Sequence, residues 1–256
     1  MHNINKFFYN RLDSTNLQAL KLIAEDELSE TFWIRAADQY AGRGQGSKTW
    51  ISEAGKNLTG TLVIFPENLA ATGQFDMLRL CALGVCDFLE LFLEDVRIKW
   101  PNDMYTGNNK IGGILIETAV VGPEVKYAIL GIGININQET FPAGIPNPVS
   151  LRNLTGITYR LEELEDLLLS ACLNRFAGMS GDLPEMVGIM PDPGQFRPEY
   201  LKKLYGYKEF APYKVNGKWL RAKIIDLDDL GQLVLEDESG LRCAYSYEEV
   251  EYIIEN

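Results

Sequence analysis

The chain has 256 residues, of which 46% are hydrophobic and 23% charged, a composition typical of a soluble globular protein with a sizeable core. Its net charge of −12 argues against a general nucleic-acid binder, because such proteins present a basic face. No apolar run reaches the ~20 residues that span a bilayer, and the first 13 residues are too polar for a secretory signal, so we expect no membrane attachment and a cytoplasmic location.

The first part of the chain alternates predicted helices and strands. Asp13 and Ser14 precede an amphipathic pattern, which predicts an N-capped helix that begins near Thr15. Periodicity predicts further helices over 75–92, 158–176 and 196–204. Alternation and β-branched residues predict strands over 31–37, 58–65, 96–100, 112–121 and 125–137. Only Gly122-Pro123 separates the last two, which favours an antiparallel hairpin and a mixed, largely antiparallel sheet.

The pattern changes in the last fifty residues. A proline-containing loop is expected over 138–151, and after Gly206 the sequence consists of short strands and tight turns. Asn216-Gly217 is a hairpin signal between two of these strands. The predicted strands cover 213–215, 218–225, 233–236 and 241–244. We therefore expect two domains, a main domain over 1–206 and a small β-barrel over 207–256.

The histidine and cysteine content restricts the chemistry. His2 is the only histidine, which disfavours Ser-His-Asp and Cys-His mechanisms and a histidine-rich zinc site. The cysteines show no CxxC or metal-ligand spacing, and three lie in apolar helical stretches, where we expect buried, inert thiols: Cys81, Cys86 and Cys172. A reaction must therefore use lysine, arginine, carboxylates, backbone amides or an oxygen-ligated metal.

The first predicted strand, 31–37, runs into a glycine-rich loop, Gly42-Arg43-Gly44-Gln45-Gly46-Ser47-Lys48-Thr49-Trp50. Its glycines leave backbone N–H groups able to approach a phosphate or carboxylate, and Arg43 and Lys48 add positive charge. The loop lacks Walker spacing, so a P-loop is not expected. Taken alone, it fits a surface turn equally well.

Three more motifs follow in order: Lys99-Trp100-Pro101-Asn102-Asp103, Lys110-Ile111-Gly112-Gly113 and Gly131-Ile132-Gly133-Ile134-Asn135. Lys99 is suited to a phosphate, and Asp103 to magnesium, which prefers carboxylate and phosphate oxygens. The same segment also fits an ordinary strand-to-turn transition with Trp100 in the core, but Lys110 close behind favours a binding site. In the last motif we expect core isoleucines and cavity-facing glycines.

The order and wording of these motifs resemble those of biotin–protein ligases, which adenylate biotin and attach it to a carboxylase lysine. The resemblance covers essentially the whole chain, and Lys-Trp-Pro-Asn-Asp followed by Lys-x-Gly-Gly-Ile-Leu is its most specific part. It implies an α+β, class II aminoacyl-tRNA-synthetase-like catalytic domain with a mixed, largely antiparallel sheet and a small SH3-like C-terminal β-barrel. It also implies ATP and Mg²⁺ as cofactors, biotin as substrate and the biotin-carrier domain of a carboxylase as partner.

The resemblance also implies roles for individual residues. The biotin-binding positions are Ser14, Thr15, Asn16, Gln39, Arg43, Gly44, Gln45, Lys110 and Gly113. The nucleotide-binding positions are Arg43, Lys48, Trp50, Lys99, Asn102, Lys110 and Asn135, with Asp103 as the magnesium ligand. Lys110 and Arg43 are the catalytic residues, because cations are needed where a carboxylate meets a phosphate.

Two departures and several alternatives accompany this interpretation. Many members have arginine where this chain has Gln45, so one phosphate donor is missing or supplied by Lys48. Members that act as repressors carry an N-terminal helix-turn-helix domain; the Asp-Ser-Thr-Asn segment begins at residue 13 here, so no DNA partner is expected. A lipoate–protein ligase or other acyl-adenylate ligase, or a non-catalytic biotin or nucleotide sensor, are the alternatives. A cysteine-dependent octanoyl transferase is disfavoured, and exposed sheet edges are compatible with a homodimer.

Overall fold

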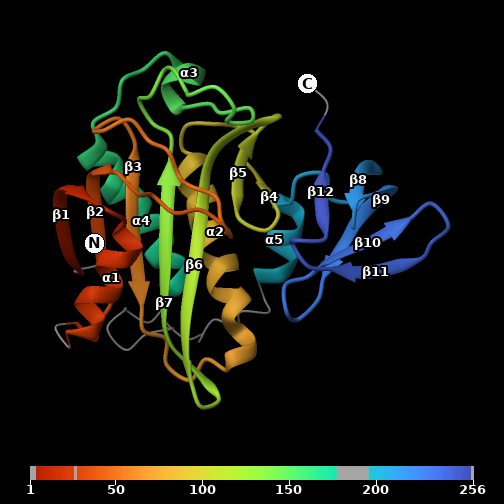
Figure 1. The fold of residues 1–256 in the computed structure, drawn as a ribbon, viewed down its shortest axis with the longest axis horizontal. Coiled ribbons are helices and arrows are strands. Elements are labelled where there is room, and N and C mark those ends of the chain that lie inside the picture. Colours follow the sequence, from red (N-terminus) through yellow and green to blue (C-terminus); the bar gives the residue numbers. More distant parts are fainter. Residues whose placement is uncertain (1–3, 26–27, 178–195, 255–256) are drawn as a thin grey trace.

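The computed structural model describes residues 4–25, 28–177 and 196–254, which form a seven-stranded sheet with helices and a separate five-stranded sheet (Figure 1). The larger sheet has the order β1-β2-β3-β7-β6-β5-β4. Its strands are β1 (Asn5–Leu12), β2 (Phe32–Gln39), β3 (Leu58–Ile64), β4 (Arg97–Lys99), β5 (Asp103–Thr106), β6 (Asn109–Val121) and β7 (Glu124–Ile134). Only the β1–β2 pair is parallel, which confirms the predicted mixed, largely antiparallel α+β sheet.

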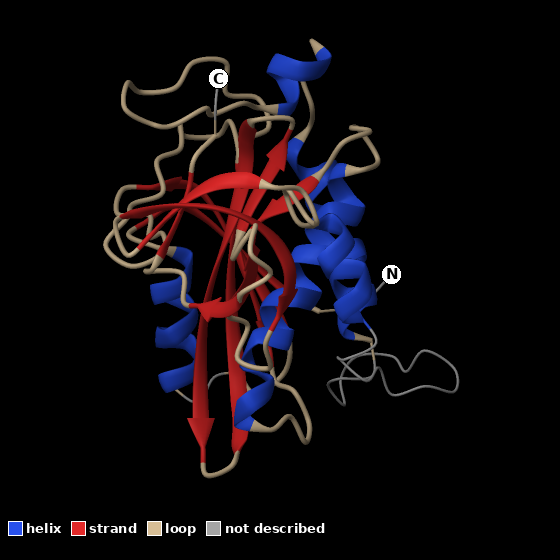
Figure 2. Cartoon of the chain, turned by 90° about the vertical axis from the view of Figure 1, so that its right-hand side faces the viewer, coloured by secondary structure: helices blue, strands red, loops and turns tan. Residues whose placement is uncertain are grey.

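Helices cover both faces of this sheet (Figure 2). They are α1 (Thr15–Ala24), α2 (Gln74–Leu89), α3 (Leu151–Thr155), α4 (Leu161–Phe176) and α5 (Arg197–Lys203), with a 3₁₀ turn at Ala71–Gly73. Helix α1 packs on one face against alternate strand residues such as Ile34 and Val63. Helices α2 and α4 pack on the other face, against Trp33 and Leu62. The alternation of strand side chains thus separates the core into two layers.

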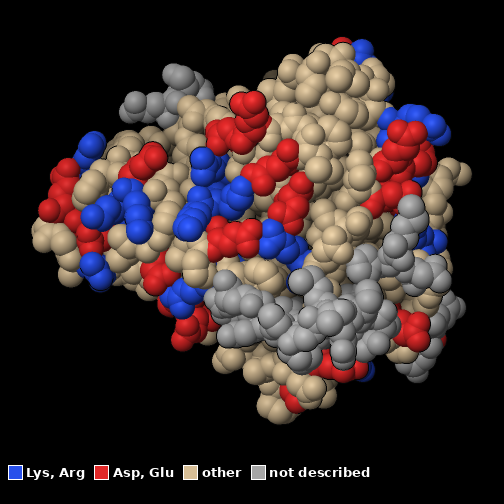
Figure 3. Space-filling view, turned by 180° about the vertical axis from the view of Figure 1, so that it is seen from behind, with Lys and Arg blue, Asp and Glu red and all other residues tan. Residues whose placement is uncertain are grey.

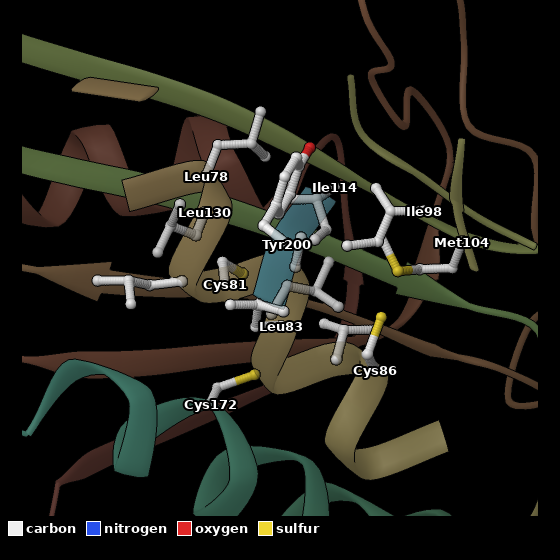
Figure 4. Close-up of a cluster of buried hydrophobic side chains, with 14 of the residues drawn as sticks. Leu78, Cys81, Leu83, Cys86, Ile98, Met104, Ile114, Leu130, Cys172 and Tyr200 are labelled. Atoms are coloured by element: carbon white, nitrogen blue, oxygen red, sulfur yellow. The ribbon is translucent and has the colours of Figure 1, made fainter. Parts of the chain in front are cut away.

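The three predicted structural cysteines lie in the second layer, as expected (Figure 4). Cys81 and Cys86 on α2 and Cys172 on α4 are fully buried. The helices come close together at Gly84, where a Cβ would lie 2.6 Å from the Cys172 Cα. Burial raises the pKa of the Cys86 thiol well above its ordinary value, so this group stays protonated and unreactive.

The start of α1 is stabilised differently from the sequence prediction. Ser14 occupies the N-cap position but its side chain makes no capping hydrogen bond. Asp13 Oδ1 accepts from the Ser14 N–H, and Gln39 Oε1 from the Thr15 N–H. The first turn is therefore hydrogen-bonded to the last residue of β2. This places the N-terminus of α1 beside the end of β2, where the chain continues into the glycine loop. His2 lies outside the described residues.

The C-terminal sheet is antiparallel with the order β11-β10-β9-β8-β12. Its strands are β8 (Ala211–Val215), β9 (Lys218–Leu227), β10 (Leu233–Asp237), β11 (Arg242–Tyr245) and β12 (Val250–Tyr252). Asn216 and Gly217 both have positive φ, which confirms the predicted hairpin turn. In the described residues β11 and β12 are the two edges, so the hydrogen-bonded ladder is open where a closed barrel was expected.

The smaller sheet packs against the end of β4. The Trp100 indole Nε1 donates to the Gly231 carbonyl over 2.9 Å, and the Tyr205 N–H donates to the Ile98 carbonyl over 2.9 Å. Gly231 is required there because a Cβ would overlap the Phe75 ring.

On the face seen in Figure 3, basic and acidic side chains are interspersed. Among the described helices, none combines the length and apolar character needed to cross a bilayer.

Candidate active site

One cavity of about 840 Å³ is lined by all four sequence motifs, by the N-terminus of α1 and by the C-terminal sheet. The cavity lies over one face of the β6–β7 pair, where Gly113, Gly131 and Gly133 have no side chains to fill the space. Every residue predicted to bind biotin, nucleotide or magnesium lines it: Ser14, Thr15, Asn16, Gln39, Arg43, Gly44, Gln45, Lys48, Trp50, Lys99, Asn102, Asp103, Lys110, Gly113 and Asn135. The structure therefore brings these residues together across more than a hundred positions of sequence.

A buried network of neutral polar groups forms one part of the cavity. Gln39 Oε1 accepts from the Thr15 N–H and hydroxyl over 2.8 and 3.1 Å. The Thr61 hydroxyl lies 2.7 Å from the Thr15 hydroxyl and donates to Asn16 Oδ1 over 2.7 Å. Gly131 leaves the space for Asn16, because a Cβ on Gly131 would overlap the Asn16 carboxamide oxygen. The network offers fixed hydrogen-bond donors and acceptors, which suits a neutral polar ligand group.

Two residues that the motif analysis missed extend this network. Thr61 is fully buried in β3, between apolar neighbours. Glu117 on β6 accepts from Asn16 Nδ2 over 2.8 Å and forms an ion pair with Arg43 over 2.9 Å. A signal for Glu117 is present in the sequence: it lies two and four residues beyond Leu115 and Gly113, which both line the cavity, and so it shares their face of the strand.

The cationic part of the cavity centres on Lys110, at the start of β6. Its ammonium forms an ion pair with Asp103 Oδ1 over 2.5 Å, and both side chains are about three-quarters buried. The backbone is fixed by the loop that follows β7: the Lys110 N–H donates to the Asn147 carbonyl over 2.7 Å, and the Val149 N–H to the Lys110 carbonyl over 3.0 Å. Lys110 is therefore a positioned charge rather than a flexible surface lysine.

Lys99 occupies an aromatic environment between the two sheets. Its ammonium lies 5.5 Å from the Tyr105 ring centroid and 5.1 Å from that of Tyr252 in β12, distances at which a cation is attracted to an aromatic face. Burial lowers the pKa of Lys99; the charge of Asp103 opposes this and that of Lys110 adds to it. A second cation beside Lys110 makes this part of the cavity suited to an anion.

The remaining predicted residues shape the walls. Asn102 Nδ2 donates to the Ile114 carbonyl over 2.6 Å and to Gln45 Oε1 over 3.2 Å, which links the glycine loop to the floor. Asn135 Nδ2 donates to the Val149 carbonyl over 3.0 Å and so holds the loop after β7. These two amides are therefore partly committed to protein contacts.

Trp50 lies directly on the sheet. A Cβ on Gly133 would come within 2.5 Å of its indole, and the Lys110 ammonium lies 5.9 Å from its ring. Its indole N–H is buried and has no hydrogen-bond partner within the part of the chain that the structure describes. A buried donor of this kind is expected to meet a ligand acceptor. The expectation that the glycines of the last motif face the cavity is thus met, with Asn16 above Gly131 and Trp50 above Gly133.

The described residues contain no cluster of three or more His, Cys, Asp or Glu side chains that could enclose a metal ion. Asp103 is a cavity carboxylate, and it is already paired with Lys110. This donor set fits a magnesium ion that arrives on a nucleotide, since Mg²⁺ at phosphate sites uses one or two carboxylates together with phosphate oxygens and water. It does not fit a metal held by the protein alone.

Comparison with known proteins agrees with this geometry. Residues 8–135, half of the chain, match the biotin/lipoate A/B protein ligase family. The biotin–[acetyl-CoA-carboxylase] ligase of Paracoccus denitrificans is 38% identical over 169 residues, which cover 63% of this chain and 68% of that protein. The bifunctional ligase/repressor BirA of Bacillus subtilis is 29% identical over 259 residues, 93% of this chain and 71% of that protein.

Solved structures share the fold. The biotin protein ligase from Aquifex aeolicus in complex with biotin and ATP superposes with a TM-score of 0.73 at 22% sequence identity, over 96% of this chain and 97% of that chain. The family match covers the segment that carries all four cavity motifs, from the glycine loop to Asn135. The chain therefore belongs to the biotin/lipoate A/B protein ligase family.

Proposed function

We propose that this protein is a biotin–protein ligase, which joins biotin to AMP at the expense of ATP and transfers biotin to a lysine of a carboxylase biotin-carrier domain. The observation that carries the proposal is the arrangement along β7. A neutral polar network lies above Gly131, and Trp50 lies above Gly133, two residues further along the same face. Lys110 lies beside the Trp50 ring and against Gly113 of the neighbouring strand β6. The Paracoccus and Aquifex relatives, named as biotin ligases, support the choice of substrate.

The polar network is proposed to bind the ureido ring of biotin. A ureido group is neutral and has both N–H donors and a carbonyl acceptor, which matches the hydroxyls and carboxamides of Thr15, Asn16 and Gln39. Ser14, also buried at the same helix N-terminus, completes this set. The carboxylate of the biotin side chain is then expected to extend toward Lys110.

The first chemical step joins two anions. A biotin carboxylate oxygen attacks the α-phosphorus of ATP, the bond from that phosphorus to the bridging β-phosphate oxygen breaks, and pyrophosphate leaves. Lys110 and Arg43 are the proposed catalytic residues, because fixed cations stabilise the charge that accumulates between carboxylate and phosphate. Lys48, Lys99, Asn102 and Asn135 are proposed to bind the rest of the nucleotide, and Trp50 to cover the adenine.

The second step consumes the mixed anhydride. The neutral amine of the acceptor lysine attacks the biotin carbonyl carbon, an amide bond forms, AMP leaves with the bonding electrons and the amine loses a proton. Water would destroy the anhydride before this attack. Gly44 and Gln45 in the loop over the cavity are therefore proposed to exclude water while the acceptor approaches.

Magnesium is proposed to enter as the MgATP complex, with Asp103 as its protein contact. When bound, the ion would neutralise phosphate charge and favour departure of pyrophosphate. Asp103 itself holds the Lys110 ammonium, so its contribution to the reaction includes the orientation of that lysine.

We further propose that the enzyme is cytoplasmic and has no DNA partner. A homodimer is compatible with β1, which is an edge strand of the larger sheet.

The division into domains 1–206 and 207–256 is proposed to follow the two sheets, with the smaller one curled as an SH3-like barrel. The smaller sheet is proposed to complete the nucleotide side of the site.

Replacing Tyr252 with leucine removes the aromatic face beside Lys99, and we expect the KM for ATP to rise about 3- to 10-fold while the KM for biotin is unchanged. Steady-state kinetics of Tyr252→Leu beside Trp219→Ala, an exposed position of the same sheet, would check this. Equal changes in both Michaelis constants would contradict it.

The proposed function is tested by mass spectrometry of the purified protein after incubation with MgATP and either biotin or lipoate. Wild-type protein is expected to form biotinyl-5′-AMP and to form little of the lipoyl analogue. Formation of the lipoyl adenylate alone would establish the lipoate–protein ligase alternative on the same site. Biotin binding without any adenylate would instead establish the non-catalytic sensor.

A further inference from the structure

A single carboxylate joins two parts of the cavity that the sequence motifs treat separately. Glu117 Oε2 accepts from the Asn16 carboxamide over 2.8 Å, and Glu117 Oε1 pairs with the Arg43 guanidinium over 2.9 Å. Asn16 belongs to α1 and Arg43 to the glycine loop, whereas Glu117 lies within β6, hydrogen-bonded to β7. Each carboxylate oxygen thus serves a different element.

The contact extends the buried network into the loop. From Gln39 the hydrogen bonds pass through Thr15, Thr61 and Asn16, and Glu117 continues them to Arg43. Asn16 is nearly fully buried, so its position is fixed from both sides by Thr61 and Glu117. The Arg43 side chain is 44% exposed, and its ion pair with Glu117 ties it to the sheet.

We propose that Glu117 is a positioning residue of the ligase: it holds the Arg43 guanidinium at a fixed place relative to Asn16, so that the glycine loop closes in register with an occupied biotin site. The inference rests on the proposed function. Glutamate suits this task because an ionised carboxylate accepts on both oxygens, and charge-assisted bonds are shorter and stronger than neutral ones. Strand β6, which is paired on both sides within the sheet, supplies the rigidity that a loop-to-loop contact would lack.

The variant Glu117→Gln separates the two contacts. A glutamine amide still offers one oxygen to Asn16 but no longer carries the charge that attracts Arg43. With MgATP and biotin as substrates, we expect kcat/KM for biotin to be about 10-fold lower in Glu117→Gln than in the wild type. The midpoint of thermal unfolding should change little, because partly exposed ion pairs contribute little to stability. The control Glu124→Gln removes an exposed carboxylate at the far end of the same hairpin and should leave kinetics unchanged.

A double-mutant cycle with Arg43→Gln distinguishes positioning from a general structural effect. If Glu117 acts through Arg43, the double variant loses no more activity than Arg43→Gln alone, because the second change removes nothing further. Additive losses would overturn the proposal. A lower KM for biotin in Glu117→Gln would overturn it too, since it would show that Glu117 competes with the ligand for Arg43.

A second measurement does not depend on activity. Amide hydrogen exchange of residues 42–50 in the ligand-free protein is expected to be faster in Glu117→Gln than in wild type and unchanged in Glu124→Gln. Unchanged exchange in Glu117→Gln would refute the anchoring of the loop. If the wild type forms no adenylate, the proposed function fails while the exchange result still decides whether Glu117 positions Arg43.

Discussion

Replacing Lys110 with alanine is expected to lower the rate of biotinyl-adenylate formation by about 10²–10³-fold, the loss usually seen when one positioned transition-state donor is removed. The ammonium lies beside Asp103 and Trp50 in the cavity, and its backbone is held by Asn147 and Val149. Removal of this charge leaves the approach of carboxylate and phosphate without its nearest fixed cation. Single-turnover measurement of adenylate formation at saturating biotin and MgATP would give the effect on the chemical step.

A matched control for this loss is Lys203→Ala, which also removes a lysine from an ion pair, with Glu90, but lies away from the cavity. The control should react at the wild-type rate. Thermal unfolding of Lys110→Ala is needed beside the kinetics, because Asp103 loses its partner and part of its stabilisation. A folded Lys110→Ala protein that retains more than about a tenth of the wild-type rate would show that Lys110 is not the principal catalyst.

The long elements of the fold could be predicted because their residues carry a strong hydrophobic period. Helix α2 and the β6–β7 hairpin at Gly122-Pro123 occur where the patterns placed them. Strand β1 was missed because it is an edge strand whose side chains are mostly exposed or half-buried, so its sequence does not alternate clearly. The short strands β5 and β12 depend on their neighbours: β12 has three residues and exists through pairing with β8. Helix α3 was missed although it has local signals, a capping box of Ser150 and Asn153 and a left-handed Gly156 at its end.

The cavity could be predicted from motifs where backbone freedom and charge occur together, as at Arg43 and Lys110. Thr61 was missed because nothing local distinguishes it, and Glu117 because its one local signal is the strand face that it shares with Gly113. Thr61 is one hydroxyl in a fully buried strand, and Glu117 gains its contacts from residues about 75 and 100 positions away. Such contacts arise only when α1, the loop and β6 meet, which a single sequence does not specify. The same holds for Tyr252, which reaches Lys99 through packing of the two sheets.

Replacing Gly131 with alanine is expected to weaken biotin binding by about 10- to 100-fold, in line with the cost of placing a methyl group where no space exists. The added Cβ would overlap the Asn16 carboxamide oxygen. Asn16 cannot withdraw easily, because Thr61 and Glu117 hold its two carboxamide atoms. Gly131→Ala therefore disturbs the polar network by displacing Asn16. Isothermal titration of biotin, without ATP, would measure this directly.

The neighbouring substitution Gly133→Ala provides the sharpest control, because it adds the same methyl group two residues along the same face of β7. Its Cβ would meet the Trp50 indole instead, so biotin affinity should be nearly preserved while ATP-dependent adenylation falls. The pair Gly131→Ala and Asn16→Ala tests the route of the effect: the double variant should bind biotin no worse than Asn16→Ala alone. Equal losses of biotin affinity at Gly131 and Gly133 would mean that both glycines serve close approach of the ligand to the strand, and that the cavity is not divided along β7 into a biotin side and a nucleotide side.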